Sequence, residues 1–484
     1  MIAKRKRSAA LRRGTVARRA KAAVAIDIAA PVADQLAAGR EARTACPRSS
    51  HAPAQRTRYA RDPVALLIES NHDRLENLIP VRHSRMLESP FAFFRGSAVL
   101  QAHDLAATAR SGIEVQACGD CHLLNFGGFA TPERNLIFDI NDFDETHPAP
   151  WEWDVKRLAA SLVLAARWRG FSKETALEAA TRVAGQYRRT MRDHADMSTM
   201  DTWYSQLTVA DIFADAADDR KATKRLAAVV KEARTRTSEH VFGKLTKDVD
   251  GTPRIVDQPP LIYHPPGENP KGTAETFIKL YTSTLREEIR MLLSRFHMVD
   301  AALKVVGVGS VGTRCHIVLF MGVHGDPLFL QVKEARKSVL ERHAGKSPWG
   351  HEGQRVVVGQ RLMQAASDIF LGWAKGPNGR DFYVRQLRDM KVSADVTAFD
   401  ADTLVRYGRI CGRALARGHA KSGSAAAIAG YLGNSAAFDE AVGLYAIAYA
   451  DQAERDYAAF QVAARNGRIA TETTTGAAVD TMVR

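Results

Sequence analysis

The spacing of apolar residues divides the chain into a helix-rich first part, a strand-rich segment and a helical end. Within Val155–Trp168, for example, apolar residues recur every three or four positions, which places them on one face of a helix. The same periodicity predicts helices elsewhere before residue 300 and after residue 350. The predicted helices span Val64–Asn71, Val155–Trp168, Thr175–Arg192, Thr273–Phe296, Gln354–Ser367, Thr403–Ala420 and Ala436–Ala464, with further helices in 200–245.

Residues 301–395 show a different pattern, in which short runs of β-branched and aromatic residues alternate with turn residues. Such runs are typical of strands. One further strand is predicted earlier, at Leu136–Phe138, and the proline-rich segment 247–272 predicts a loop. The strands predicted in the later region are Leu303–Val308, Cys315–Phe320, Pro327–Val332 and Asp381–Leu387.

Together these patterns predict an α+β protein with a helix-rich larger lobe and a small antiparallel sheet. We assign the larger lobe to residues 61–300 and the sheet to 301–395, and we expect helices in 396–484 to return to the larger lobe. The length of 484 residues and the 45% of hydrophobic residues suffice for several domains and a sizeable core.

The positive charge of the chain is concentrated at its N-terminus. The formal net charge is +14, and residues 1–21 hold nine Lys or Arg residues and no acidic residue. We expect residues 1–60, rich in Arg, Ala and Pro, to form a basic tail that is disordered or loosely helical. Such a tail can contact nucleic acid or an anionic surface weakly. A solvated extension is the favoured interpretation, because no aromatic residues are interleaved with the charges.

No segment predicts export or membrane insertion. Ala22–Ile26 is too short for a secretory signal and is followed directly by Asp27. No stretch approaches the roughly 18 apolar residues of a membrane-spanning helix. The five cysteines are few and scattered, which argues against a disulfide framework and favours the reducing cytoplasm.

Several oxygen-bearing side chains cluster in loops of the first third of the chain. Asp120 and Asn125 stand in a glycine-containing loop, and Asp142 follows a predicted strand. Carboxylate and amide oxygens suit Mg²⁺, and a carboxylate can orient a nucleophilic hydroxyl. We predict Asn125 and Asp142 as metal ligands and Asp120 as the group that accepts or orients the acceptor proton. Asp139 and Asp144 compete with Asp142, which we prefer for its strand-end position.

A second candidate site begins at the glycine-rich segment 307–312, which reads Gly-Val-Gly-Ser-Val-Gly. A dinucleotide-binding loop would lead into a helix, but strand-like residues follow here. Glycines between two strands are typical of the lid over the nucleotide phosphates of protein kinases, which predicts a lysine on the third strand. Lys333 stands at that point, although an ordinary glycine hairpin followed by a surface lysine is the simpler alternative. The residues predicted to bind ATP are Gly307, Gly309, Ser310, Gly312 and Lys333.

Spacings within the first group of residues also match kinases. Asp120 and Asn125 are five positions apart, like the catalytic Asp and the metal-binding Asn of the kinase pattern. The run Gly119–Asn125 resembles the loop of aminoglycoside and other small-molecule kinases. Asp142 resembles their metal-binding aspartate, and Asp154 resembles the aspartate behind their catalytic loop. The resemblance implies a small molecule rather than a protein as acceptor.

The order of these motifs is reversed relative to an ordinary kinase. The glycine-rich segment and Lys333 follow Asp120 instead of preceding it. The predicted helix Thr403–Ala420 resembles the helix that leads into a kinase catalytic loop. We therefore expect a two-lobed, kinase-like fold that is circularly permuted, which a chain tolerates where breaks fall in exposed loops.

Longer segments carry a resemblance to one family. They are Phe91–Gly96, Gly119–Gly127, Asn141–Glu145, Val306–Arg314, Gln331–Ala335, Gly359–Gln364 and Tyr449–Gln452. With these segments the chain resembles the bacterial domain of unknown function family 2252 over roughly residues 60–465. The family is uncharacterised, so the resemblance implies little about activity.

Two features depart from the kinase pattern. Cys118 and Gly119 stand where kinases carry His or Arg before the catalytic Asp. In addition, no helix-borne glutamate is evident as the partner of Lys333, although that pair normally positions the phosphates. The nearest candidates are Glu334 and Glu352, which are poorly placed, and Gln360 and Gln364, which can substitute.

Other candidate residues have simpler structural explanations. Cys118 and Cys121 can form a redox pair or, with His122, half of a zinc site. The sequence has no second Cys-x-x-Cys motif, so we favour a structural role. Three arginines that precede these cysteines in the chain can bind phosphate oxygens, although a role in structural ion pairs is favoured. They are Arg82, Arg85 and Arg95.

The leading interpretation is an ATP- and Mg²⁺-dependent phosphotransferase that acts on the hydroxyl of an unknown small molecule. One alternative is a nucleotide-binding pseudokinase or a nucleotidyltransferase, because Lys333 has no evident helical partner. Another is a non-enzymatic protein that associates with nucleic acid through the basic tail.

Overall fold

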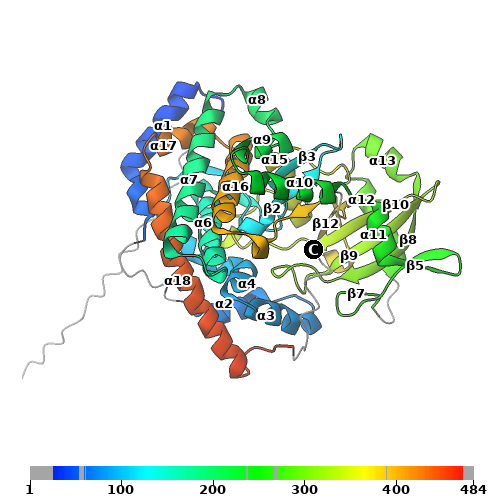
Figure 1. The fold of residues 1–484 in the computed structure, drawn as a ribbon. Coiled ribbons are helices and arrows are strands. Elements are labelled where there is room, and N and C mark those ends of the chain that lie inside the picture. The colour runs from blue at the N-terminus through cyan, green and yellow to red at the C-terminus, as the bar shows by residue number, and fades with distance from the viewer. Residues whose placement is uncertain are drawn as a thin grey trace, which may run out of the picture.

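Long helices form one side of the molecule and an antiparallel sheet forms the other, with short strands between them (Figure 1). The computed structural model describes residues 26–53, 59, 61–235, 238–265, 270–387 and 390–472. The predicted contact through residues 1–21 lies outside the described residues. The mixture of helices with several small antiparallel sheets agrees with the expected α+β class.

On the helical side, four helices pack around α7. One of them, α6, is rich in alanine and leucine, and every residue from Trp151 to Ala166 is buried. Small side chains let the neighbouring helices approach closely on all sides. The five helices are α6 (Trp151–Trp168), α7 (Lys173–Asp196), α16 (Ala401–Ser422), α17 (Ala425–Leu432) and α18 (Ala437–Arg465).

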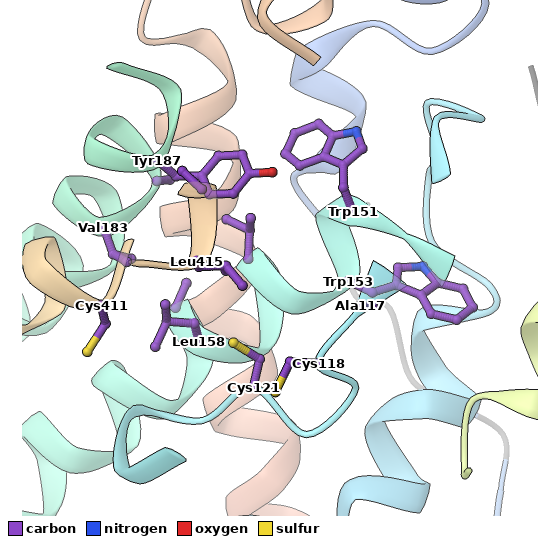
Figure 2. Close-up of a cluster of buried hydrophobic side chains, with 14 of the residues drawn as sticks. Ala117, Cys118, Cys121, Trp151, Trp153, Leu158, Val183, Tyr187, Cys411 and Leu415 are labelled. Atoms are coloured by element: carbon purple, nitrogen blue, oxygen red, sulfur yellow. The ribbon is translucent and has the colours of Figure 1, made fainter. Parts of the chain in front are cut away.

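Figure 2 shows the core where α6 begins. Trp151 stacks on Tyr187 with the ring centroids 5.4 Å apart. The thiols of Cys118 and Cys121 point into the same core from the loop below. Trp151 and Trp153 are both buried and anchor this core.

Part of the predicted disordered tail is folded. α1 (Val32–Ala45) packs against α17. A Cβ at Gly39 would lie 1.9 Å from the carbonyl oxygen of Ala427, so glycine is needed for this approach. The Arg43 Nε donates to the carbonyl of Tyr431 at 2.7 Å. The expectation was wrong for α1 because its contact face is made of small residues, which give little apolar periodicity.

Four short helices follow and pack against the end of α18. Asp62 caps the first by accepting from the amides of Val64 and Ala65. Val308, from the glycine-rich segment, joins the apolar cluster between these helices and α18. The four helices are α2 (Pro63–Ser70), α3 (Ile79–Leu87), α4 (Pro90–Gly96) and α5 (Ala98–Leu105).

The large sheet has six antiparallel strands in the order β11-β12-β10-β9-β8-β7. Its strands are β7 (Ile262–Tyr263), β8 (Phe296–Lys304), β9 (Cys315–Gly322), β10 (Pro327–Glu334), β11 (Gly372–Lys375) and β12 (Asp381–Gln386). Residues 305–314 form the connection between β8 and β9. The strand predicted at Leu303–Val308 was therefore displaced, since β8 begins earlier and ends at Lys304.

The helix predicted over Thr273–Phe296 is also different. It consists of α12 (Pro270–Thr282) and α13 (Glu287–Leu293), and Phe296 already belongs to β8. The Thr284 hydroxyl lies 2.8 Å from the carbonyl oxygen of Tyr281 and 3.0 Å from that of Trp373. These contacts end α12 and fix it to the sheet, and periodicity alone gives no signal for them.

Short strands lie between the helices and the large sheet. β1 (Glu114–Ala117) pairs with β4 (His147–Pro150), and β2 (Phe126–Ala130) pairs with β3 (Leu136–Ile140). β13 (Val392–Ser393) extends the second pair to three strands. β3 contains the strand predicted at residues 136–138.

The remaining elements cover the edges of the molecule. α15 packs against both the large sheet and α16, and β5 pairs with β6 inside the segment predicted as a loop. These elements are α8 (Thr199–Tyr204), α9 (Val209–Asp215), α10 (Arg220–Thr235), α11 (Ser238–Leu245), β5 (Thr246–Val249), β6 (Thr252–Ile255), α14 (Glu341–Ala344) and α15 (Glu352–Met363). No helix among the described residues is both long and apolar enough to span a bilayer. The division of the chain at residues 60, 300 and 395 stays a prediction.

A buried ion pair ties β3 to α16. The Arg417 Nη2 lies 2.8 Å from the Asp139 carboxylate, and both side chains are almost fully buried. The Asp139 carboxylate also accepts from the amide of Ala365 at 2.9 Å. Asp139, one of the aspartates considered as a metal ligand, therefore serves the fold.

Replacing Asp139 by Ala is expected to lower the free energy of unfolding by about 3–5 kcal/mol, because it leaves the Arg417 charge buried without a partner. Urea unfolding measures this difference. The matched control is Glu178→Ala, which removes the exposed pair between Glu178 and Arg182 on α7 and is expected to cost under about 0.5 kcal/mol. Equal losses in the two variants would contradict a structural role for Asp139.

Candidate functional site

Two loops lie side by side because strands pair at both of their ends. The loop of residues 118–125 joins β1 to β2, and the loop of residues 141–146 joins β3 to β4. β1 pairs with β4 and β2 pairs with β3, so the loops are held together at each end. The Asn141 amide donates to the carbonyl of Asn125 at 2.7 Å and links the loops directly.

The first loop turns at Gly119. Its φ is 86°, and a Cβ there would lie 2.2 Å from a carbonyl oxygen of the second loop, so only glycine fits. The carboxylate of Asp154, on α6, accepts from the amides of Cys118 and Gly119 at 2.6 and 3.0 Å. His419 of α16 lies 3.1 Å from the same carboxylate. These contacts fix the backbone that carries Asp120.

Asp120 is oriented by an arginine from α6. The Arg157 Nε donates to its Oδ1 at 2.6 Å. Arg157 also donates to Gln101 Oε1 at 2.8 Å and to the carbonyl of Phe94 at 3.1 Å, so its guanidinium is rigidly held. Burial raises the pKa of Asp120, and the charge of Arg157 opposes this rise. The Asp120 side chain keeps one fifth of its surface exposed.

The two predicted metal ligands come from the two loops. The Asn125 Nδ2 donates to the carbonyl of Asp120 at 2.5 Å. The amide oxygen of Asn125 is therefore the side-chain atom that could bind a metal. Asp142 directly follows Asn141, whose amide binds Asn125. The side chain of Asp142 is one third exposed, and its Oδ1 accepts from the amide of Asp144 at 3.2 Å. Asn125 and Asp142 therefore lie on adjacent segments.

Lys333 reaches these loops from β10. Its Nζ lies 2.6 Å from Asp144 Oδ2 and 3.9 Å from Asp142 Oδ1, although its side chain is only 2% exposed. Burial alone would lower the pKa of Lys333, but the two carboxylates raise it above its ordinary value. Burial alone would raise the pKa of Asp144, but Lys333 and Tyr383 hold it at about 2. The pair is therefore charged at neutral pH.

The glycine-rich segment reaches the same carboxylate. The Ser310 hydroxyl donates to Asp144 Oδ2 at 3.1 Å. The segment is held at its start by the Arg85 Nη1, which donates to the carbonyl of Gly307 at 2.5 Å. Gly309 lies beside the backbone of Arg95. Gly312 accepts through its carbonyl from the amide of Leu75 at 2.7 Å. Of the predicted ATP-binding residues, Ser310 and Lys333 thus contact Asp144, and the three glycines lie on the segment that carries Ser310.

Two residues of β12 that the sequence did not single out complete this site. Tyr383 pairs with Lys333 across the sheet, and its hydroxyl donates to Asp144 Oδ1 at 2.6 Å. The Arg385 Nη1 donates to the carbonyl of Asn141 at 3.1 Å. Both side chains point the same way because they stand two positions apart on a strand. Their spacing was visible, but nothing in the sequence indicated which strand pairs with β10.

α15 contributes an arginine where the kinase pattern predicts a glutamate. Arg355 is fully buried, and its guanidinium donates to the carbonyls of Thr146 and Asp144 at 2.5 and 3.0 Å. It therefore fixes the backbone of the loop that carries the partner of Lys333. The residues considered as that partner are engaged elsewhere: Glu352 with Arg355, Glu334 with Arg314 and Arg380, and Gln360 with Gln364.

The cysteine pair of the first loop is structural. Cys118 and Cys121 are free, buried thiols. Their contact lowers and burial raises the pKa of Cys118, which is about 11, and burial raises the pKa of Cys121 well above its ordinary value. Thiols in this state are poor nucleophiles and metal ligands. His122 accepts from the amide of Leu124 at 3.2 Å, in agreement with a structural role.

The oxygen donors suit a magnesium ion that also binds phosphate. The Asn125 amide oxygen and the Asp142 carboxylate would supply two ligands, and phosphate oxygens and water can complete the octahedron. No group of three or more His, Cys, Asp or Glu side chains that could hold a metal is present in the described part of the chain. The donor set therefore fits a shared metal–phosphate site better than an all-protein metal centre.

The fold and the site define a mixed α+β protein in which a buried lysine from a sheet meets the acidic loops of a helical region. The chain belongs to the family described as "Uncharacterized protein conserved in bacteria (DUF2252)", whose model matches residues 74–463. The resemblance of the sequence to this family is thereby confirmed. Comparisons with curated proteins and with solved structures gave no match.

The pairing of Asp144 predicts a dependence of stability on pH. Its pKa is about 2 in the folded protein against 3.8 for the ordinary group, so its contribution is complete above pH 5 and is lost as the pH falls toward 2. We expect Asp144→Asn to remove about 1 kcal/mol of the stability lost between pH 5 and pH 3. Urea unfolding at several pH values measures this slope.

The control for this experiment is Asp402→Asn, which neutralises an exposed aspartate on α16. It is expected to keep the wild-type slope between pH 5 and pH 3. A wild-type slope in Asp144→Asn would mean that the Lys333–Asp144 pair does not contribute to stability in solution.

Proposed function

We propose that the protein is an ATP- and Mg²⁺-dependent phosphotransferase that acts on the hydroxyl group of a small molecule. The observation that carries this proposal is the meeting of Lys333 and Ser310 with the Asp142–Asp144 loop. Ser310 and Lys333 follow Asp144 by 166 and 189 positions in the sequence, yet both contact its carboxylate. A lysine, a glycine-rich segment and a metal-binding aspartate are the parts with which kinases hold nucleotide phosphates.

Each residue has a defined role in this proposal. Lys333 and the glycine-rich segment 307–312 bind the phosphates of ATP, and Asn125 and Asp142 hold Mg²⁺. When bound, Mg²⁺ neutralises the charge that develops on the phosphate oxygens. Asp120 orients the acceptor hydroxyl and takes its proton. The acceptor oxygen forms a bond to the γ-phosphorus, the bond from that phosphorus to the bridging oxygen breaks, and ADP leaves.

The order of elements supports a kinase-like, permuted arrangement. The glycine-rich segment joins two neighbouring strands, β8 and β9, and Lys333 stands on the next strand, β10. The end of α16 lies against β1, where the Ser422 hydroxyl is 3.4 Å from the carbonyl oxygen of Gln116. β1 leads directly into the loop with Asp120. A helix that leads into this loop through space rather than along the chain is what a permuted kinase requires.

A second candidate is a nucleotide-binding protein without phosphotransfer. Two observations favour it. The Asp120 carboxylate is already engaged by Arg157, and the charge of Arg157 opposes proton uptake. The partner of Lys333 is Asp144 rather than a helical glutamate. The two candidates differ only in whether bound ATP is consumed.

Binding of ATP with Mg²⁺ is expected to raise the melting temperature of the full chain. At a ligand concentration 100 times Kd the stabilisation is about 2.7 kcal/mol. Asp142→Asn should remove the Mg²⁺ dependence of the shift, and Lys333→Met should weaken ATP binding at least about tenfold. Lys375→Met, on strand β11 of the same sheet and largely exposed, is the control that should bind like the wild type. No shift at millimolar ATP would contradict both candidates.

Consumption of ATP distinguishes the phosphotransferase from the nucleotide-binding protein without phosphotransfer. With pools of hydroxylated metabolites, the phosphotransferase should produce ADP, and Asp120→Asn should lower the rate by about 10²-fold or more while ATP affinity is kept. ATP binding without ADP formation in any pool would favour the second candidate. The same rate in Asp120→Asn and in the wild type would exclude Asp120 as the group that takes the proton.

A further inference from the structure

A cavity lies behind the glycine-rich segment, between the α2–α3 connection and the residues that follow α18. Its volume is about 720 Å³, within the range of small-molecule sites. The Ser310 side chain faces Asp144, whereas Arg74, from the cavity wall, donates to the carbonyl of Val311 at 2.6 Å. The charged and polar residues that line it are Asn71, His72, Asp73, Arg74, Glu76, His83, Arg314 and Arg468.

Arg74 lines this cavity, and Arg82 and Arg336 stand close to Arg74 but outside the lining. Arg74, Arg82 and Arg336 surround the end of α2, and their hydrogen bonds go to carbonyl or amide oxygens. Within the described ranges, no carboxylate lies within ion-pair distance of any of the three. Buried charges are normally paired, because an isolated one is costly. Burial, and after it the charges of Arg82 and Arg336, lower the pKa of Arg74 well below its ordinary value, and the carboxylates of Glu145 and Glu334 oppose this shift.

One of these arginines is connected to the cavity by a buried chain of hydrogen bonds. Arg82 is only 2% exposed, and its Nε has no hydrogen-bond partner within the described residues. Its Nη1 donates to Asn71 Oδ1 at 2.8 Å, and Asn71 Nδ2 lies 2.9 Å from His83 Nε2. His83 Nδ1 lies 2.7 Å from the carbonyl oxygen of Ala470. Asn71, His83 and Ala470 line the cavity.

Three other charged residues of the lining are already ion-paired. Asp73 is paired with Arg380 at 2.8 Å, so its carboxylate is already compensated. Arg314 donates to the carbonyl of Asp73 at 3.2 Å and pairs with Glu334 at 3.3 Å, so its charge is compensated too. Arg468 pairs with Asp62 at 2.6 Å, but both groups are about half exposed. Among the described residues, Arg74 is thus the lining arginine without a carboxylate partner, and Glu76 adds an exposed carboxylate to the lining.

We infer that this cavity binds a small molecule bearing a phosphate group and that its occupancy holds the glycine-rich segment. Arg74 would bind the phosphate while it keeps its bond to Val311, and its side chain packs against Gly312. The Leu75 amide, next in the chain, donates to the carbonyl of Gly312 at 2.7 Å. Phosphate binding is independent of the proposed function. Its effect on ATP affinity rests on that function, since the same segment would cover the nucleotide.

The test uses the full chain without nucleotide and titrates inorganic phosphate at constant ionic strength, followed by calorimetry. We expect saturable binding to the wild type. Arg74→Gln and His72→Glu should each weaken it at least about tenfold, because one removes a charge-assisted hydrogen bond and the other adds a repelling carboxylate. His72→Glu changes an exposed side chain and keeps the test decisive if Arg74→Gln does not fold.

Two controls separate this site from the rest of the molecule. Arg182→Gln removes an exposed arginine of α7 and should bind phosphate like the wild type. Lys333→Met should also bind it like the wild type. Loss of binding in Lys333→Met would overturn the inference, because phosphate would then occupy the candidate ATP site. Absence of saturable binding to the wild type, or wild-type affinity in His72→Glu, would overturn it as well.

Coupling between the two sites is measured by repeating the ATP titration with saturating phosphate. A higher ATP affinity in the wild type, absent in His72→Glu, is expected if the cavity steadies the glycine-rich segment. Unchanged ATP affinity would overturn the coupling but not the binding. Failure of ATP to bind at all would contradict the proposed function and leave the phosphate result standing.

Discussion

The ion pair between Lys333 and Asp144 is the interaction on which the arrangement of the site depends. A lysine at the buried end of a strand keeps its charge only if a carboxylate neutralises it. Asp144 supplies that carboxylate from a loop of the helical region, at 2.6 Å. The Ser310 and Tyr383 hydroxyls donate to the same group from the glycine-rich segment and from β12. One carboxylate therefore fixes the large sheet against the acidic loops.

The residues around this pair show how the loop itself is kept in place. Arg355 of α15 binds two carbonyls of the 141–146 loop, and Arg385 of β12 binds a third. On the other side, Asp154 holds the start of the 118–125 loop through two amides. The side chains with exposed surface, Asp120 and Asp142, thus stand on backbone that is fixed from three directions. Such rigidity is what a site needs if its charges are to be positioned before a ligand binds.

The sequence indicates candidate residues for the site, but not the contacts between them. The spacing of Asp120, Asn125 and Asp142 reflects a local hairpin, so it is readable from the chain. The approach of Lys333 depends on how the sheet packs against the loops, which no spacing encodes. For the same reason the partner of Lys333 was sought on a helix, whereas Asp144 takes that place. The sequence indicates Asp144 only as a possible metal ligand.

The secondary structure was likewise predicted in part. Long periodic helices such as α6, α7, α16 and α18 were predicted within a few residues of their observed ends. α1 was not predicted, because its contacts use small residues such as Gly39. The break between α12 and α13 was also missed, because the contacts of the Thr284 hydroxyl that fix it are tertiary. Periodicity reports burial on one face, and it is silent where small residues or side-chain hydrogen bonds decide the structure.

The central claim is that the acidic loops and the lysine-bearing sheet form one metal–nucleotide site. A crystal structure of the full chain with Mn²⁺ and a non-hydrolysable ATP analogue tests it most directly, because the metal is located by its anomalous scattering. We expect a metal peak at the Asn125 amide oxygen and the Asp142 carboxylate, with the phosphates between that metal and Lys333. A nucleotide bound elsewhere, or a metal bound away from Asn125 and Asp142, would contradict the claim.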